Sequence, residues 1–283
     1  MDSAAAARTQ VWVISLATAS QRRASFQESA ASSGLAWSFW DAHQQLDAAL
    51  SYDRDGLLIN LGRPLTDAER GCYSSHYSLW QWLIQSPCEQ MIVLEDDVIA
   101  DWRFLEALSR IRFEDYGIEY LRLFAKVPSQ WRYVRSPFLG WYHHLIRFTG
   151  YPLGTQAYLM CRSAALKMLS AGSSVTAPVD AFMDQSWLHG VLNLALHPFH
   201  IVERYQSSSI GEERLRDGAT PGGRTRLPRA RRYVKRKLRL AWSVYGPEPL
   251  AARRLKRELV RRDVRVPALV GAADGGAPQI HKT

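Results

Sequence analysis

The sequence of 283 residues has no apolar run that approaches the ~20 residues needed for a membrane-spanning helix. Its first ten residues, MDSAAAARTQ, contain an early acid and no apolar stretch of the length found in signal peptides. It also contains neither a Walker-type phosphate loop nor a GxGxxG motif. We therefore expect a cytoplasmic protein without the common phosphate-binding loops.

Cysteine is scarce, and its number and spacing argue against a disulfide framework and against a cysteine metal site. The three cysteines, Cys72, Cys88 and Cys161, are an odd number and lack the spacing of a metal site. Reduced thiols in a core are the expected state. A hydrophobic content of 47% and ten tryptophans indicate a folded globular protein.

Positive charge is concentrated near the C-terminus. The net charge is +9, yet residues 211–265 hold 18 Lys+Arg against 6 Asp+Glu, and the remainder holds 18 against 21. We predict a disordered N-terminus over residues 1–9, a near-neutral catalytic domain over 10–210 and a basic, partly helical tail over 211–283. Clustered positive charge attracts anionic membranes or nucleic acid.

The basic tail contains a predicted amphipathic helix. Nine basic residues and no acid lie between Arg224 and Arg239. The segment from Arg224 to Tyr245 is predicted to bind an anionic membrane surface, with a charged helix facing solvent as the alternative. A second, weaker helix is predicted around Leu255 and Leu259. The apolar positions of the first helix at helical spacing are Val234, Leu238, Ala241 and Tyr245, with Trp242 beside them.

Residues 91–98, MIVLEDDV, form an apolar run that ends in three carboxylates, Glu95, Asp96 and Asp97. An unbroken apolar run is typical of a strand buried on both faces, and such a strand delivers its last residues to the rim of a sheet. Three adjacent anions repel one another, which favours a bound cation. We expect a divalent metal that carries a phosphorylated ligand.

Strands and helices are predicted to alternate along the chain. Strands are expected at residues 11–16, 36–40, 120–125 and 156–161, and helices from Ser20 to Gly34, from the Thr66 capping box to about residue 86, and near Asp101, Ser163 and Pro178. This alternation predicts an α/β fold with a mainly parallel, Rossmann-type sheet, whose ligands bind beyond the carboxyl ends of the strands. The aromatic segment 126–151 is expected to be a loop that stacks sugar rings or packs over the core.

Three groups of polar residues are candidates for the site. Arg22 and Arg23 lie in the first turn of a predicted helix, where they form a solvated basic turn or meet an anionic ligand. His76 lies on an apolar helical stripe, where a core role is the default. Asp180 and Asp184, at i and i+4, are predicted to share one helix face.

Several short motifs, in this order, resemble glycosyltransferase family 25 over about residues 10–210. They are VISL followed by paired arginines, LTDAERGCYSSHYSLW, VLEDDV, GTQAYLMCR and PVDAFMD. The resemblance implies a GT-A type fold, a nucleotide-sugar donor, usually a UDP-hexose, and a divalent cation, commonly Mn²⁺ (or Mg²⁺). Ser15 departs from the Asn of many members.

The resemblance also implies roles for individual residues. Glu95, Asp96 and Asp97 match the acidic motif that holds donor and metal. Their chemistry favours Glu95 and Asp97 as metal ligands and Asp96 as a partner of donor hydroxyls. Asp180 or Asp184 is expected to be the catalytic base, and the sequence leaves the choice open. The other matched donor-site residues are Leu16, Arg22, Ser75 and His76.

The predicted function is inverting transfer of a hexose, galactose or glucose, from a UDP-sugar. The acceptor is expected to be a glycan or glycolipid, a lipid-linked saccharide such as lipopolysaccharide or lipooligosaccharide. The enzyme would act at the inner face of the cytoplasmic membrane. The alternatives are a metal-dependent phosphohydrolase that uses the same carboxylates and a nucleic-acid-binding protein that uses the basic tail. Nucleic acid is the less favoured partner because the positive charge is confined to the tail.

Overall fold

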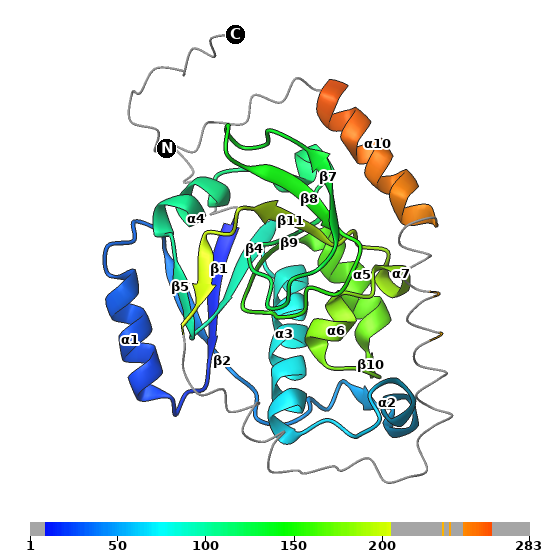
Figure 1. Ribbon diagram of the computed structural model, residues 1–283. Coiled ribbons are helices and arrows are strands. Elements are labelled where there is room, and N and C mark those ends of the chain that lie inside the picture. Colours follow the sequence, from blue (N-terminus) through cyan, green and yellow to red (C-terminus); the bar gives the residue numbers. More distant parts are fainter. Residues whose placement is uncertain (1–8, 205–233, 235–237, 239–245, 262–283) are drawn as a thin grey trace, which may run out of the picture.

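The computed structural model describes residues 9–204, 234, 238 and 246–261. An eight-stranded sheet with the order β2-β1-β4-β9-β6-β11-β8-β7 forms its centre (Figure 1). Six strands run in one direction, and β9 and β8 are reversed. The strands are β1 (Thr9–Ser15), β2 (Trp37–Asp41), β4 (Gln90–Glu95), β6 (Tyr120–Arg122), β7 (Trp131–Arg135), β8 (His144–Phe148), β9 (Ala157–Cys161) and β11 (Leu194–His197).

The described fold also contains two small sheets and nine helical segments whose bounds are defined. β3 (Ser51–Tyr52) pairs with β10 (Ser174–Val175), and β5 (Val98–Ala100) pairs with β12 (Ile201–Glu203). The helices are α1 (Ser20–Ala30), α2 (Arg54–Asn60), α3 (Asp67–Gln85), α4 (Trp102–Ser109), the 3₁₀ helix η1 (Phe113–Tyr116), α5 (Arg162–Gly172), α6 (Val179–Met183), α7 (Ser186–His189) and α10 (Pro247–Arg261).

The central sheet is covered on both faces, which explains the apolar run in β4. Ile92 and Leu94 pack into a core with α1, α4 and η1, whereas Met91 and Val93 pack against α3, α5 and α6. Successive residues of a strand point to opposite faces, so a strand with two covered faces must be apolar throughout. The predicted α/β class and the buried central strand are confirmed.

Local sequence signals predicted some helix ends correctly and others incorrectly. Thr66 caps α3 as predicted, because its Oγ1 accepts from the Glu69 N–H (3.2 Å) and its own N–H donates to Glu69 Oε2 (3.0 Å). Asp101 caps α4 by accepting from the Phe104 N–H (3.1 Å). Helix α1 begins at Ser20 as predicted, although Ser20 was expected to cap the helix and the N-cap is Ala19, which makes no side-chain cap bond. The helix ends at Ala30, before the predicted end at Gly34.

Residues 126–151 are not the single loop that was predicted. They contain β7 and β8, which form an antiparallel hairpin at the edge of the sheet. The prediction failed because the prolines and glycine lie at the ends of these strands and suggested one irregular segment. Of the aromatic residues, Trp141 and Tyr142 in the connecting turn are 86% and 80% exposed, whereas Phe138 and Phe148 are buried.

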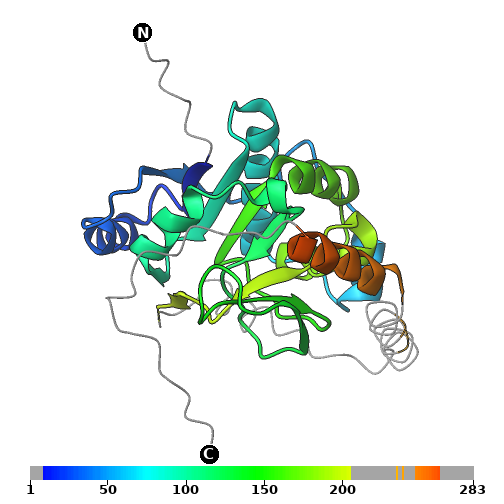
Figure 2. The ribbon, with the colours of Figure 1, turned by 90° about the horizontal axis from the view of Figure 1, so that it is seen from above.

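The predicted second helix of the tail exists as α10, but its apolar face is buried against the domain. Leu255 and Leu259 join the core beside η1 and β7, so this face is not free to meet a membrane (Figure 2). Glu248 forms an ion pair with Arg147 of β8 (2.8 Å) and accepts a hydrogen bond from Ser186. Residues 247–261 therefore pack on the domain that was predicted to end at residue 210.

Other parts of the predicted organisation lie outside the described residues. Residues 1–8 are among these, and Thr9 already belongs to β1. Most of the segment from Arg224 to Tyr245 is also outside; its two described residues, Val234 and Leu238, are helical and exposed. Within the described part of the chain, no helix combines the length and the apolar content required to cross a membrane.

We predict that Glu248→Ala lowers the free energy of unfolding by about 3 kcal/mol, because it leaves Arg147 buried without its counter-charge. Urea denaturation would measure the change. Glu258→Ala removes an exposed carboxylate from the same helix and should change stability by less than about 0.5 kcal/mol. Equal effects of the two substitutions would contradict the docking of α10 through Glu248.

Candidate active site

The acidic residues after β4 meet the end of β1 at the carboxyl edge of the sheet. Ser15, the last residue of β1, donates its hydroxyl to Asp96 Oδ2 (2.6 Å), and Arg22 Nη1 lies 3.3 Å from Asp96 Oδ1. Burial raises the pKa of Asp96, while the Ser15 hydrogen bond and the Arg22 charge oppose the rise. The half-buried Leu16 follows Ser15 directly. The structure thus brings Arg22 to the acidic motif, and Leu16 is next in sequence to the Ser15 that bonds Asp96.

The second arginine of the pair has a different position. Arg23 donates to the Ser15 carbonyl (2.8 Å), pairs with Asp41 at the end of β2 and lies over the Phe39 ring (4.7 Å to the centroid). It therefore joins the ends of β1 and β2. Only Arg22 of this pair contacts the acidic motif.

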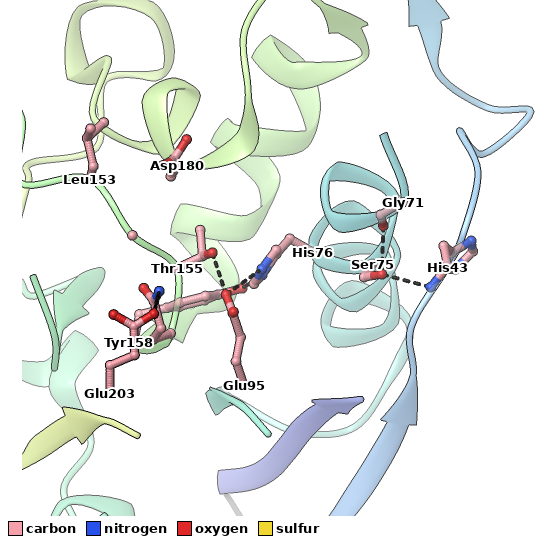
Figure 3. Close-up of polar contacts among 12 residues, drawn as sticks. His43, Gly71, Ser75, His76, Glu95, Leu153, Thr155, Tyr158, Asp180 and Glu203 are labelled. Carbon is pink, nitrogen blue, oxygen red and sulfur yellow. Dashed lines mark hydrogen bonds and ion pairs between the residues drawn. The ribbon is translucent and has the colours of Figure 1, made fainter. Parts of the chain in front are cut away.

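Glu95 lies in a buried polar group formed by α3 and β9 (Figure 3). Its Oε1 accepts a hydrogen bond from Thr155 and lies 3.7 Å from His76 Nε2. Burial alone would raise the pKa of Glu95, but His76 and the Thr155 hydrogen bond outweigh it and lower the pKa. His76 is fully buried, and its Nδ1 lies 3.0 Å from the Tyr158 hydroxyl. Glu95 is thus held ionised beside the histidine.

Asp97 is the least neutralised carboxylate of the acidic motif. Burial, together with the charges of Glu95, Glu203 and Asp96, raises its pKa to about 7. Its Oδ1 is buried and has no hydrogen-bond partner among the described residues. A buried oxygen without a partner, in a cluster of anions, is suited to a bound cation.

Glu203 was missed by the sequence analysis. It lies at the end of β12, whose pairing with β5 brings it beside Asp97. Lys126 Nζ (3.0 Å) and Gln156 Nε2 (3.3 Å) both donate to Glu203 Oε1. No local motif marked this residue, because only the pairing of two short strands places it in the site.

Glu95, Asp97 and Glu203 offer carboxylate oxygens, the donor type that a hard divalent cation such as Mn²⁺ or Mg²⁺ prefers. A second group, formed by Cys72, His76 and Glu95, has ligand atoms within 4.8 Å of one another. Burial raises the pKa of the Cys72 thiol well above its usual value, and a soft sulfur donor suits Mn²⁺ or Mg²⁺ less well than oxygen. The carboxylate group is therefore the better candidate.

Ser75 supports the site from the opposite face of α3. Its hydroxyl donates to the Gly71 carbonyl (2.7 Å) and accepts from the His43 N–H (2.8 Å), which ties the segment after β2 to the helix (Figure 3). A Cβ on Gly71 would lie 2.2 Å from the His43 carbonyl oxygen, so this contact requires glycine. Of the predicted Ser75–His76 pair, His76 faces Glu95 and Ser75 does not.

Asp184 lies in a buried ion pair at the end of α6. Its carboxylate accepts from Arg122 Nη2 (2.6 Å), Asn193 Nδ2 (2.8 Å) and the Leu153 N–H (2.9 Å), and its side chain is fully buried. Arg122 also donates to the Gly154 carbonyl (2.6 Å). This network fixes the turn that precedes Thr155, in which Leu153 and Gly154 have positive φ angles of 52° and 80°.

Asp180 has a different environment from Asp184. It is half-buried, and its carboxylate accepts one described hydrogen bond, from the Ala181 N–H (2.7 Å). Figure 3 shows it on the same side of the site as Leu153 and Thr155. Asp184 is the C-cap of α6, and its N–H donates to the Asp180 carbonyl (3.3 Å), so the two residues are one helical turn apart as predicted. Their surroundings differ, because the Asp184 carboxylate is buried against Arg122 and Asp180 is half-buried.

These features define an α/β protein with a carboxylate-rich candidate site at the carboxyl edge of its sheet. The sequence of residues 8–183 matches the family "Glycosyltransferase family 25 (LPS biosynthesis protein)", and the chain belongs to this family. The resemblance in the sequence motifs is thereby confirmed.

Individual relatives are similar to parts of the chain. The lipooligosaccharide biosynthesis protein lic2B of Haemophilus influenzae is 32% identical over 88 residues, which are 31% of this chain and 33% of the relative. Procollagen galactosyltransferase 2 of Homo sapiens is 43% identical over 49 residues, 17% of this chain and 8% of the relative. The "Probable inactive glycosyltransferase 25 family member 3" of Bos taurus is 30% identical over 129 residues, which are 43% of this chain and 21% of the relative. The matches span no more than a third of the length of each of these relatives.

We predict that the ionisation of Asp97 lowers the free energy of unfolding as pH rises from about 4 to about 7. Its pKa is about 7 in the folded protein and about 3.9 when unfolded, so the folded state holds a proton that the unfolded state has lost. This contribution is fully present below about pH 4 and is lost as pH rises through about 7. Asp97→Asn should therefore gain stability relative to the wild type between pH 5 and pH 8, in urea unfolding with EDTA present.

The control for this prediction is Asp55→Asn, which changes an exposed carboxylate. Its stability relative to the wild type should be the same at both pH values. A constant difference between Asp97→Asn and the wild type would contradict the raised pKa of Asp97.

Proposed function

We propose that the protein is an inverting glycosyltransferase that moves a hexose, galactose or glucose, from a UDP-sugar to a lipid-linked saccharide. The observation that carries the proposal is the cluster of Glu95, Asp96 and Asp97 beside Arg22, inside the segment that matches the family. Galactose is supported by the name of the human relative and a lipooligosaccharide acceptor by that of the Haemophilus relative. Because one relative is named as inactive, the family alone does not establish activity.

The donor is proposed to bind at the carboxyl ends of β1 and β4. Glu95 and Asp97 would hold a divalent cation, with Glu203 as a further candidate ligand. A bound cation supplies positive charge for the diphosphate that leaves with the nucleotide. Arg22, at the same edge, can bind a phosphate oxygen, and Asp96 can accept from a donor hydroxyl. Leu16 would line the nucleotide pocket, and this arrangement is consistent with a GT-A fold.

Asp180 is the better candidate for the catalytic base. A base must accept the proton of the acceptor hydroxyl as that oxygen attacks. The carboxylate of Asp184 already accepts three buried hydrogen bonds and is paired with Arg122. Asp180 keeps acceptor capacity in a half-buried position. We assign Asp184 the task of positioning the turn that presents Thr155 to Glu95.

The proposed location is the inner face of the cytoplasmic membrane. The basic segment from Arg224 to Tyr245 would bring the enzyme to a membrane-anchored acceptor through its attraction to anionic lipid. The burial of Leu255 and Leu259 leaves this task to the earlier segment.

The function is tested by nucleotide release from a panel of UDP-sugars with Mn²⁺, with and without lipooligosaccharide. We expect release that depends on both metal and acceptor, and Asp97→Ala should abolish it with the fold intact. Release of free sugar or phosphate at the same rate without acceptor would instead support the phosphohydrolase. No turnover of any donor with any saccharide acceptor would contradict the proposal.

We predict that Asp180→Asn and Asp184→Asn have different effects. Loss of a general base lowers kcat by about 10²–10⁴-fold, and Asp180→Asn should do so with little change in stability. Asp184→Asn leaves Arg122 without its counter-charge and should lower the free energy of unfolding by about 3 kcal/mol. Steady-state kinetics and urea denaturation of both variants check this. A nearly wild-type kcat for Asp180→Asn would place the base elsewhere.

A further inference from the structure

Helix α10 lies beside the edge strand β7, at the edge of the sheet opposite β2 (Figures 1 and 2). Side chains of β7, β8 and α10 line a basic groove there. It has a volume of about 410 Å³, within the range of small-molecule sites. Arg132 and Tyr133 line it from β7, Arg147 from β8, and Arg253 and Lys256 from α10. None of these residues belongs to the carboxylate site described above.

The positive charge of the groove is only partly compensated. Arg147 is 3% exposed and paired with Glu248, so its charge is balanced. Within residues 9–204 and 246–261, no carboxylate forms an ion pair with Arg132, Arg253 or Lys256. Three cations that line one hollow, with no ion-pair partner in the described part of the chain, are suited to an anionic ligand. Guanidinium groups bind phosphate oxygens in bidentate geometry, which favours a phosphate.

The groove also offers an aromatic surface. Tyr133 is 56% exposed, and edge contacts with Trp131 (4.9 Å between ring centroids) and His144 (5.4 Å) hold its ring in place. A fixed, exposed aromatic ring provides apolar contact for a ligand that also carries polar groups. A ligand with a phosphate group beside a sugar ring could contact both the basic side chains and the Tyr133 ring.

A second hollow extends the basic surface along the same face of α10. Its volume is about 370 Å³, and it shares Arg253 and Lys256 with the groove. Its other lining residues are Arg257, Val260 and Arg261. These positions follow helical spacing, whereas Leu255 and Leu259 of the same helix are buried in the core.

We propose that the groove between β7 and α10 binds a phosphorylated mono- or disaccharide, with the phosphate on Arg132, Arg253 and Lys256 and the sugar on Tyr133. A hollow that is lined by an almost fully buried arginine is better suited to a small ligand than to the flat surface of a membrane. The binding itself does not depend on the proposed transferase activity. If that activity exists, the groove would hold a phosphorylated part of the acceptor, which deepens the proposed function.

The test is isothermal titration calorimetry on the full chain with glucose 6-phosphate as the probe. Arg132→Gln and Arg253→Gln should each weaken binding at least tenfold. Arg254→Gln is the matched control, because it changes the neighbouring arginine of α10, which does not line the groove, and its affinity should stay within twofold of the wild type. Arg22→Gln should also bind normally, which separates the groove from the donor site. Unfolding midpoints confirm that each variant is folded.

Two further ligands test the chemistry of the groove. Inorganic phosphate should bind more weakly than glucose 6-phosphate. Tyr133→Ala should reduce the affinity for glucose 6-phosphate and leave the affinity for inorganic phosphate unchanged. Equal binding of glucose 6-phosphate by Arg132→Gln and the wild type would overturn the proposal, as would its loss in Arg22→Gln. Any binding of the protein to phosphatidylglycerol vesicles should be the same for Arg132→Gln and the wild type. Vesicle binding that requires Arg132, without binding of the sugar phosphate, would identify a membrane site and also overturn it.

Discussion

Mutual repulsion of carboxylates at the end of β4 is the constraint around which the site is built. Glu95, Asp96 and Asp97 each have a different partner. Glu95 lies beside His76 and accepts from Thr155, Asp96 meets Ser15 and Arg22, and Asp97 faces Glu203 with its Oδ1 unpaired. Glu95 and Asp96 therefore have described polar partners, whereas Asp97 Oδ1 has none among the described residues.

The supporting structure places these partners with little freedom. The buried pair of Arg122 and Asp184 fixes the turn before Thr155, and Thr155 in turn holds Glu95. Breaking such a buried pair leaves an uncompensated charge, so the pair also stabilises the fold. Asp184, one of the two residues predicted as a candidate base, thus has a structural task, and in the proposed mechanism the base is Asp180, one turn earlier.

The C-terminal part of the chain contributes to the domain as well as to its surface. Helix α10 covers the edge strand β7, buries Leu255 and Leu259 and directs a row of basic side chains outward. Covering an edge strand protects its free backbone groups. The same helix forms one wall of the basic groove, so one element both stabilises the fold and builds a candidate ligand site.

The sequence by itself determined the elements whose signals are local. The apolar run before Glu95 predicted a strand with two covered faces, the Thr66 capping box predicted the start of α3, and the family motifs predicted which carboxylates gather at the sheet edge. Only the tertiary structure decided what depends on contacts between distant segments. Glu203 enters the site through the pairing of β12 with β5, Asp184 turns inward to meet Arg122, and α10 returns to pack on β7. Periodicity and caps report on neighbours within a few residues, whereas these pairings join positions about 60 to more than 100 residues apart, which no local pattern encodes.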